Sequence, residues 1–209
     1  MLTFIIIVIV FIYSVIIHEV SHGLAALWLG DPTAKYMGRL TLNPISHVDP
    51  IGSILVPLIT FFAGGFIFGW AKPVPYNPYN LRDQKYGPAL VGAAGPVSNI
   101  LIALVFGFVL RVFLVTGQVS VSESGVIFSV FSYAILINVL LAFFNLIPFP
   151  PLDGSKLLFA ILPIREETKM QLEQFGLIFL FILIYALSGP ISIFLHFIQS
   201  FFFRVVVGI

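Results

Sequence analysis

The sequence contains no cysteine, and only 9% of its 209 residues are charged. The absence of cysteine excludes a disulfide framework, a thiolate nucleophile and a thiolate metal site, so any chemistry must use histidine, carboxylate and hydroxyl groups. Hydrophobic residues make up 59% of the chain. In an ordinary soluble domain about 45–50% of the residues are apolar and about a quarter are charged. This balance is typical of an integral membrane protein. The formal net charge of +1 says nothing about partners, and we expect no nucleic-acid partner.

The apolar residues gather in six segments separated by polar stretches. The segments cover residues 1–29, 51–70, 88–116, 125–147, 172–187 and 190–207, and a helix needs about 20 residues to cross a bilayer. Most lysines and arginines lie in the polar stretches 30–50, 71–87 and 152–171, and loops rich in these residues tend to stay cytoplasmic. We therefore predict an all-α integral membrane protein, a single domain over residues 1–209, with these three stretches on the cytoplasmic side.

Segment 51–70 cannot cross the membrane once if both of its flanking stretches are cytoplasmic. Pro57 and the Gly64-Gly65 pair offer the breaks that a re-entrant hairpin requires, and irregular backbone is tolerated at membrane depth where protein or water covers it. An ordinary sixth crossing is the alternative, and it would leave one basic stretch outside. The re-entrant interpretation gives five transmembrane helices in the plasma membrane, with the N-terminus outside and the C-terminus inside.

Three ionisable residues interrupt the first apolar segment, within the sequence "SVIIHEVSHGLAAL" (residues 14–27). His18 and His22 are four residues apart, so on a helix both imidazoles lie on one face and can reach a single Zn²⁺, with Glu19 beside them to hold a water. A pair of hydrogen-bonded histidines packed against neighbouring helices is the structural alternative. Each ionisable group costs free energy in apolar surroundings, so three of them within one and a half turns indicate a functional metal site.

A catalytic zinc site usually has three protein ligands and one open position, so a third ligand is expected elsewhere. His196, in "FLHFIQ", has the context of an interfacial residue, and His47 and Asp49 lie in the turn-rich sequence "LNPISHVDP". Asp153 is the best candidate, because the prolines of "NLIPFPPLDG" break the helix ahead of it and leave backbone groups unpaired, as membrane proteins do beside a site or cavity. A loop aspartate that caps the following helix is the alternative. In the predicted topology, the three ligands meet near the cytoplasmic side.

Three motifs occur in a fixed order along the chain: "HEVSH" at 18–22, "GPVSN" at 95–99 and "NLIPFPPLDG" at 145–154. With "GRLTLNPISHVDP" and "WAKPVPYNP", they resemble the signatures of the site-2 protease family of intramembrane zinc metalloproteases, in its compact prokaryotic subgroup without a PDZ domain. The resemblance covers about residues 10–165, and residues 172–207 form a C-terminal helical pair. It implies one Zn²⁺ per chain, held by His18, His22 and Asp153, with Glu19 as the catalytic acid and base.

The resemblance also suggests residues that support the site. Asn145 is a group that holds substrate backbone, with Asn99 nearby, and the small residues of "GPVSN" let helices approach closely. We expect His47 to act beside the metal on the transition state, because a fourth protein ligand would leave no open position for hydrolysis. A structural loop histidine is the alternative, and Asp49 either orients the His47 ring or caps the segment that follows.

These observations predict a zinc-dependent endopeptidase that cleaves a transmembrane or membrane-proximal peptide bond of a single-span membrane protein, with its site open toward the cytoplasm. A short strand-like cytoplasmic stretch, "MGRLTLN" (residues 37–43), alternates polar and apolar residues and would pair with unwound substrate. A divalent-metal transporter is the alternative, although such proteins often have repeated halves and no repeat is visible here. A di-iron lipid oxidase would need more histidines than the four present.

Overall fold

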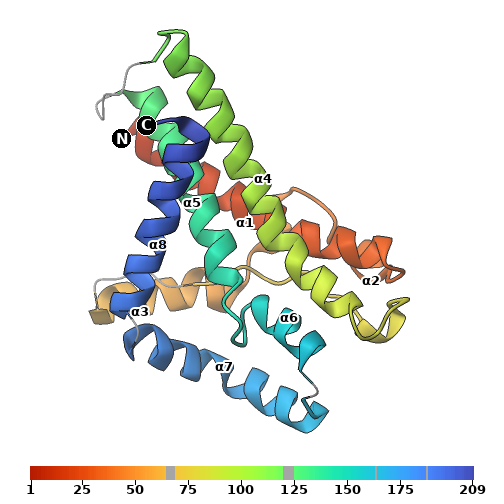
Figure 1. The fold of residues 1–209 in the computed structure, drawn as a ribbon. Coiled ribbons are helices and arrows are strands. Elements are labelled where there is room, and N and C mark those ends of the chain that lie inside the picture. The colour runs from red at the N-terminus through yellow and green to blue at the C-terminus, as the bar shows by residue number, and fades with distance from the viewer. Residues whose placement is uncertain (65–68, 120–124, 163, 187) are drawn as a thin grey trace.

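The protein, seen here in a computed structural model, is built of helices joined by turns and extended segments (Figure 1). The structure describes residues 1–64, 69–119, 125–162, 164–186 and 188–209, and these residues form no strand. The predicted all-α class is therefore confirmed. The strand-like stretch 37–43 is irregular; Arg39 is buried and Leu42 is exposed, so the alternation of this stretch does not produce the edge of a sheet.

In the part of the chain that the structure describes, four helical segments are long and apolar enough to cross a membrane, as expected of a multi-pass membrane protein. They are α1 (Leu2–Trp28), α4 (Gly87–Val115), α5 (Val126–Asn145) and Gly189–Val207, the last formed by α8 (Ser188–Phe202) and the π-helical turn Phe203–Val207. The predicted fifth crossing, 172–187, falls within α7 (Glu166–Ala186), apart from residue 187, which lies outside the described residues.

Helix α7 is not among the four candidate spans and lies across one end of the bundle in Figure 1. Its first turns carry charged residues, at positions 166, 167, 169 and 173, which make this part of the helix costly to place in hydrocarbon. A crossing by α7 stays a prediction. The placement of the C-terminus inside stays a prediction as well, because four crossings leave both termini on the same side.

The two ends of segment 51–70 lie next to each other. It starts in the π-helical turn Pro50–Leu55 and continues as α3 (Val56–Gly64) through Pro57, so the chain does not break at that proline. Near the other end of the segment, the backbone N–H of Trp70 donates to the carbonyl of Gly52 at 3.0 Å. A re-entrant segment requires this doubling back, although the membrane position of the segment stays a prediction. Residues 65–68, which include Gly65, lie outside the described residues.

The apolar core lies where α4, α5 and the C-terminal span meet. Its largest fully buried members are Leu110 on α4 and Ile135 and Val139 on α5, and Phe202 and Val207 close it from the C-terminal side. Helix α4 also packs along α1, and this contact places the histidine-bearing part of α1 against the "GPVSN" part of α4. Helix α4 packs against both α1 and α6 (Gly154–Ile161), the two helices between which the site described below lies.

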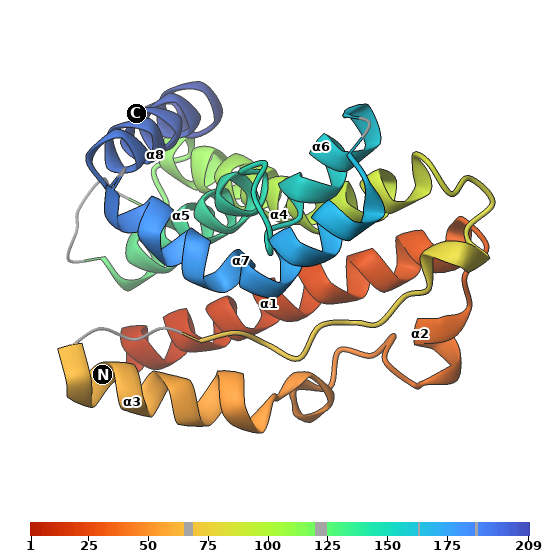
Figure 2. The same ribbon diagram turned by 90° about the horizontal axis from the view of Figure 1, so that it is seen from below.

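The end of α1 is fastened to the segment that leads into α4. Asp31 is fully buried, and its carboxylate accepts hydrogen bonds from the backbone N–H of Asn77 at 2.6 Å, from Asn80 Nδ2 at 2.9 Å and from the side chain of Thr33. Figure 2 shows the consequence: the extended segment that follows Gly69 runs alongside α1 on its way to α4.

Candidate active site

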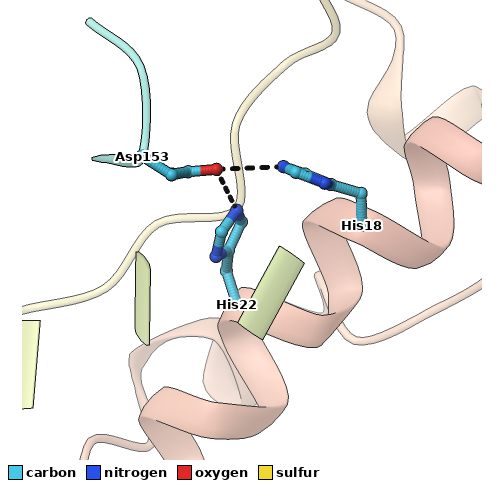
Figure 3. A group of neighbouring side chains, drawn as sticks. All are labelled: His18, His22 and Asp153. Carbon is cyan, nitrogen blue, oxygen red and sulfur yellow. Dashed lines mark hydrogen bonds and ion pairs between the residues drawn. The ribbon is translucent and has the colours of Figure 1, made fainter. Parts of the chain in front are cut away.

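Three buried side chains converge between α1 and the turn that precedes α6 (Gly154–Ile161). The Nε2 atoms of His18 and His22 each lie 3.0 Å from Oδ2 of Asp153 (Figure 3). One ligand atom from each residue falls within 4.8 Å of the other two. The two histidines share a face because one helical turn separates them. The structure thus brings together the three residues that the sequence suggested as metal ligands, although 135 positions separate His18 from Asp153.

Asp153 reaches the histidines because the chain turns tightly after α5. A Cβ atom added to Gly154 would overlap the backbone carbonyl groups of Leu146 and Ile147, so only glycine allows this turn to close. The second carboxylate oxygen of Asp153, Oδ1, accepts a hydrogen bond from Lys156 Nζ at 2.9 Å. One oxygen therefore faces the imidazoles, and a lysine engages the other.

Gly95 of "GPVSN" lies directly over the two imidazoles. A Cβ atom at this position would lie 2.5 Å from Nε2 of His22 and 2.6 Å from Nε2 of His18, closer than real Cβ contacts allow. The absence of a side chain keeps the space between the Nε2 atoms open. The small residues of this motif thus allow the close approach of α4 that the sequence predicted.

The outer nitrogen of each imidazole has its own partner. Nδ1 of His22 lies 2.7 Å from the backbone carbonyl of Val91, and Nδ1 of His18 lies 2.6 Å from Oδ1 of Asn99. Both partners are oxygens that only accept, so both Nδ1 atoms carry the proton. Metal-binding histidines usually use their second nitrogen in this way, which directs the lone pair of Nε2 toward the metal.

The polarity of these contacts shows that the site fits a cation. Two imidazole Nε2 atoms face one carboxylate oxygen, so either further protons on Nε2 or a single metal ion must lie among the three atoms. Burial raises the pKa of Asp153, but the two histidines and the charge of Lys156 outweigh it and hold this pKa well below its usual range. Two neutral imidazoles and one ionised carboxylate are a ligand set that zinc prefers.

Lys156 adds a fixed positive charge beside this group. Burial lowers the pKa of its amine, but the Asp153 carboxylate raises it more strongly, so the net pKa lies above its ordinary value and the amine stays protonated. The ammonium group also lies 5.7 Å from the centre of the Tyr76 ring. Lys156 thus connects the ligand turn with the extended segment that covers α1.

Glu19 is half-buried beside the two histidines and is held by backbone. Its Oε2 accepts a hydrogen bond at 2.9 Å from the N–H of Val74, in the extended segment shown alongside α1 in Figure 2. Gly23 lies one turn after Glu19, and a Cβ atom there would come within 2.7 Å of Cγ1 of Val74. The glycine therefore allows the segment to lie close enough to orient the carboxylate.

The remaining sequence candidates lie outside the ligand group. Nε2 of the buried His47 is 2.8 Å from the carbonyl of Thr41, so its predicted role beside the metal has no contact here that supports it and stays a prediction. Asp49 caps the following turn by accepting from the N–H groups of Ile51 and Gly52, which is the second of its two expected roles.

Two further residues named from the sequence show no contact that tests their roles. Asn145 donates from Nδ2 to the carbonyl of Leu141 in its own helix at 2.9 Å, and its substrate role stays a prediction. His196 is exposed on α8.

Sequence reasoning missed three groups near the site: Val74, Lys156 and Asn138. Asn138 is fully buried on α5 and bonds to Asn99. A polar residue in an apolar span is a signal that could have found it. The position of Lys156, three residues after Asp153, is also a sequence signal, because oppositely charged side chains at this spacing can pair. Val74 had no signal, because it acts through its backbone.

Comparison with known proteins places the chain in a family. A sequence model described as peptidase family M50 matches residues 111–189. YwhC of Bacillus subtilis (strain 168) is 40% identical over 178 residues, which are 84% of this chain and 78% of YwhC. The chain belongs to peptidase family M50. This confirms the resemblance to the site-2 protease family and the expectation of an enzyme.

Two further relatives are less similar to the chain. Rip2 of Mycolicibacterium smegmatis is 29% identical over 151 residues, 72% of this chain and 55% of that protein. Rip2 of Mycobacterium tuberculosis (strain ATCC 25618 / H37Rv) is 28% identical over 187 residues, 88% of this chain and 68% of that protein. The names of YwhC and both Rip2 proteins describe them provisionally as zinc metalloproteases. No solved structure matches the chain.

Proposed function

We propose that this M50 peptidase is a zinc-dependent intramembrane endopeptidase that cleaves a transmembrane or membrane-proximal bond of a membrane protein. The observation that carries the proposal is the convergence of Asp153, in the turn before α6, on His18 and His22 of α1, a helix long enough to span a bilayer. Glu19 lies beside the two histidines on the same helix. The provisional names of the relatives agree with zinc as the metal.

One zinc per chain would be held by Nε2 of His18, Nε2 of His22 and Oδ2 of Asp153. When bound, zinc polarises the scissile carbonyl and lowers the pKa of water toward 7, which supplies a nucleophile in a site with little access to bulk solvent. The Nδ1 contacts of the two histidines keep both rings in the orientation that metal binding needs. Lys156 keeps Oδ1 of Asp153 engaged and leaves Oδ2 for the metal.

Glu19 is the proton carrier of the reaction. Its carboxylate accepts the proton of the attacking water and returns it to the leaving amine. The hydrogen bond from the Val74 N–H fixes Oε2, which leaves Oε1 for the water.

The substrate is a single-span membrane protein whose helix is locally unwound at the scissile bond. A peptide bond inside a helix is shielded by its own hydrogen bonds, so the protease must bind an extended stretch. The site opens toward the cytoplasm, because two basic stretches contribute residues to it, 71–87 through Val74 and 152–171 through Asp153, and loops rich in lysine and arginine tend to stay cytoplasmic. In this orientation the N-terminus lies outside, and segment 51–70 enters the membrane from the cytoplasmic side and returns to it.

The test uses the purified protein in lipid vesicles with a panel of single-span membrane peptides. We expect cleavage that a chelator abolishes and added zinc restores, with about one zinc per chain. Glu19→Gln should keep its zinc and lose about 10²–10⁴ in turnover, the usual contribution of a positioned acid or base. Glu167→Gln, an exposed glutamate on α7, is the matched control and should behave like the parent.

Two outcomes would refute the proposal. Full peptide cleavage by Glu19→Gln would show that this carboxylate is not the base. Zinc-loaded protein that cleaves no peptide, and that carries metal ions across the vesicle membrane, would indicate the transporter alternative.

A further inference from the structure

A chain of hydrogen bonds crosses the protein from α5 to the metal-binding face of α1. Asn138 on α5 and Asn99 on α4 are both fully buried. Asn99 Nδ2 donates to Oδ1 of Asn138 at 2.7 Å, and Oδ1 of Asn99 lies 2.6 Å from Nδ1 of His18. Two asparagines and one histidine from three helices thus form a continuous path that ends at a proposed metal ligand.

Backbone carbonyl groups set the direction of this path, because a carbonyl only accepts. The Nδ2 group of Asn138 donates to the carbonyl of Ala134 at 2.9 Å and to Oγ of Ser14 at 2.9 Å. Both of its hydrogens are used, so Oδ1 of Asn138 must face Asn99 and accept. Nδ2 of Asn99 also reaches the carbonyl of Ser14 at 3.3 Å. The amide of Asn99 then has one possible orientation, with Oδ1 toward His18.

We infer that Asn138 is a positioning residue for the metal ligand His18. It fixes the amide of Asn99, Asn99 accepts the Nδ1 proton of His18, and the lone pair of Nε2 is directed at the ligand group. This role rests on the proposed zinc site. Without Asn138, only the longer contact with the Ser14 carbonyl, at 3.3 Å, holds Nδ2 of Asn99. The amide can then turn its Nδ2 group toward His18, which favours the other tautomer and places a proton on Nε2 where the metal binds.

His22 provides an internal comparison. Its Nδ1 is 2.7 Å from the carbonyl of Val91, a backbone group that cannot reverse. The orientation of His22 therefore needs no further support, whereas His18 depends on two side chains that can turn. The inference accordingly concerns one histidine of the pair and not the site as a whole.

The test compares two variants of opposite volume change, Asn138→Leu and Asn138→Ser, in the full-length protein. We expect both to bind Zn²⁺ about 10–100-fold more weakly in chelator competition, which is the usual cost of losing a partner behind a metal ligand. The visible spectrum of bound Co²⁺ should change in both, because this spectrum depends on the ligand field and the orientation of the His18 imidazole changes. Thermal unfolding of the metal-free proteins separates this effect from a general loss of stability.

Ser14→Ala is the matched control. It removes one acceptor of the Asn138 amide but leaves the carbonyl of Ala134, so the orientation of the path persists and zinc affinity should stay within about twofold of the parent. Folded Asn138 variants with the zinc affinity and cobalt spectrum of the parent would overturn the inference. If the parent itself bound no zinc, the proposed function would fail first, so the two failures are distinguishable.

A measurement on the unmodified protein covers the case in which the variants do not fold. With ¹⁵N-labelled histidine, the four rings of the zinc-loaded protein can be told apart by their long-range proton couplings. We expect His18 to carry its proton on Nδ1 and to bind through Nε2. Coordination through Nδ1, or a proton on Nε2, would overturn the inference by itself.

Discussion

Replacement of Gly95 by alanine separates the effect of local helix propensity from the effect of the site. Alanine in a helix interior is favoured over glycine by about 1 kcal/mol, so propensity alone predicts a more stable protein. The added Cβ would lie 2.5 Å from Nε2 of His22 and 2.6 Å from Nε2 of His18, roughly 0.9 Å inside ordinary contact. The rings cannot move aside freely, because Val91 and Asn99 hold their outer nitrogens.

The strain of one excess methyl group in a packed site is about 1–3 kcal/mol. If it falls on the ligand group, the strain weakens zinc binding by about 5- to 140-fold. We therefore expect Gly95→Ala to lose zinc affinity in chelator competition and to lose peptide cleavage at limiting zinc, while its circular dichroism spectrum stays helical. Gly189→Ala on α8 is the matched control, because no atom of the described residues lies within 4 Å of its added Cβ.

Gly92→Ala gives an intermediate case. Its Cβ would lie 2.9 Å from Cδ of Lys156 and 3.1 Å from the backbone oxygen of Asp153, both longer than the contacts at Gly95, so we expect a smaller loss than at Gly95. Zinc binding of parental strength in Gly95→Ala would refute the reasoning, since it would show that α4 does not press against the two histidines in solution.

Three further predictions concern groups around the site. The pKa of Asp31 is lowered, because its hydrogen bonds outweigh the effect of burial, so its ionised form stabilises the fold above about pH 4 and this contribution is lost as the pH falls through the lowered pKa. Asp31→Asn should therefore lower the free energy of unfolding by about 1–3 kcal/mol at pH 7, and its deficit against the parent should shrink in acid; a deficit independent of pH would contradict this. Single cysteines at positions 35 and 82 should both be labelled from the cytoplasmic side, and one at position 120, outside the described residues, from the other side. Labelling of 35 and 82 from opposite faces would make segment 51–70 a full crossing. His47→Ala should keep its zinc and lose about 10²–10³ in turnover if the ring acts on the transition state, whereas full activity would show a structural role.

Periodic and compositional features were readable from the sequence because they are local. Long apolar runs determine which segments can span a bilayer, and the spacing of His18 and His22 places both rings on one face of any helix. The proline-broken stretch before Asp153 predicted an unwound turn, and the structure has one there. Helix α7 was harder to judge, because its apolar half follows a charged half within one continuous helix.

The tertiary structure alone decided how the site is supported. The partner of Glu19 is the backbone N–H of Val74, and every residue except proline has such a group, so no side-chain pattern could reveal it. The path from Asn138 through Asn99 to His18 joins three helices, and it depends on how those helices pack and on which carbonyls they present. The sequence by itself determined which residues can bind a metal, because that is a property of their chemistry. Which nitrogen faces the metal is a property of distant neighbours, and only the packed protein brings those neighbours together.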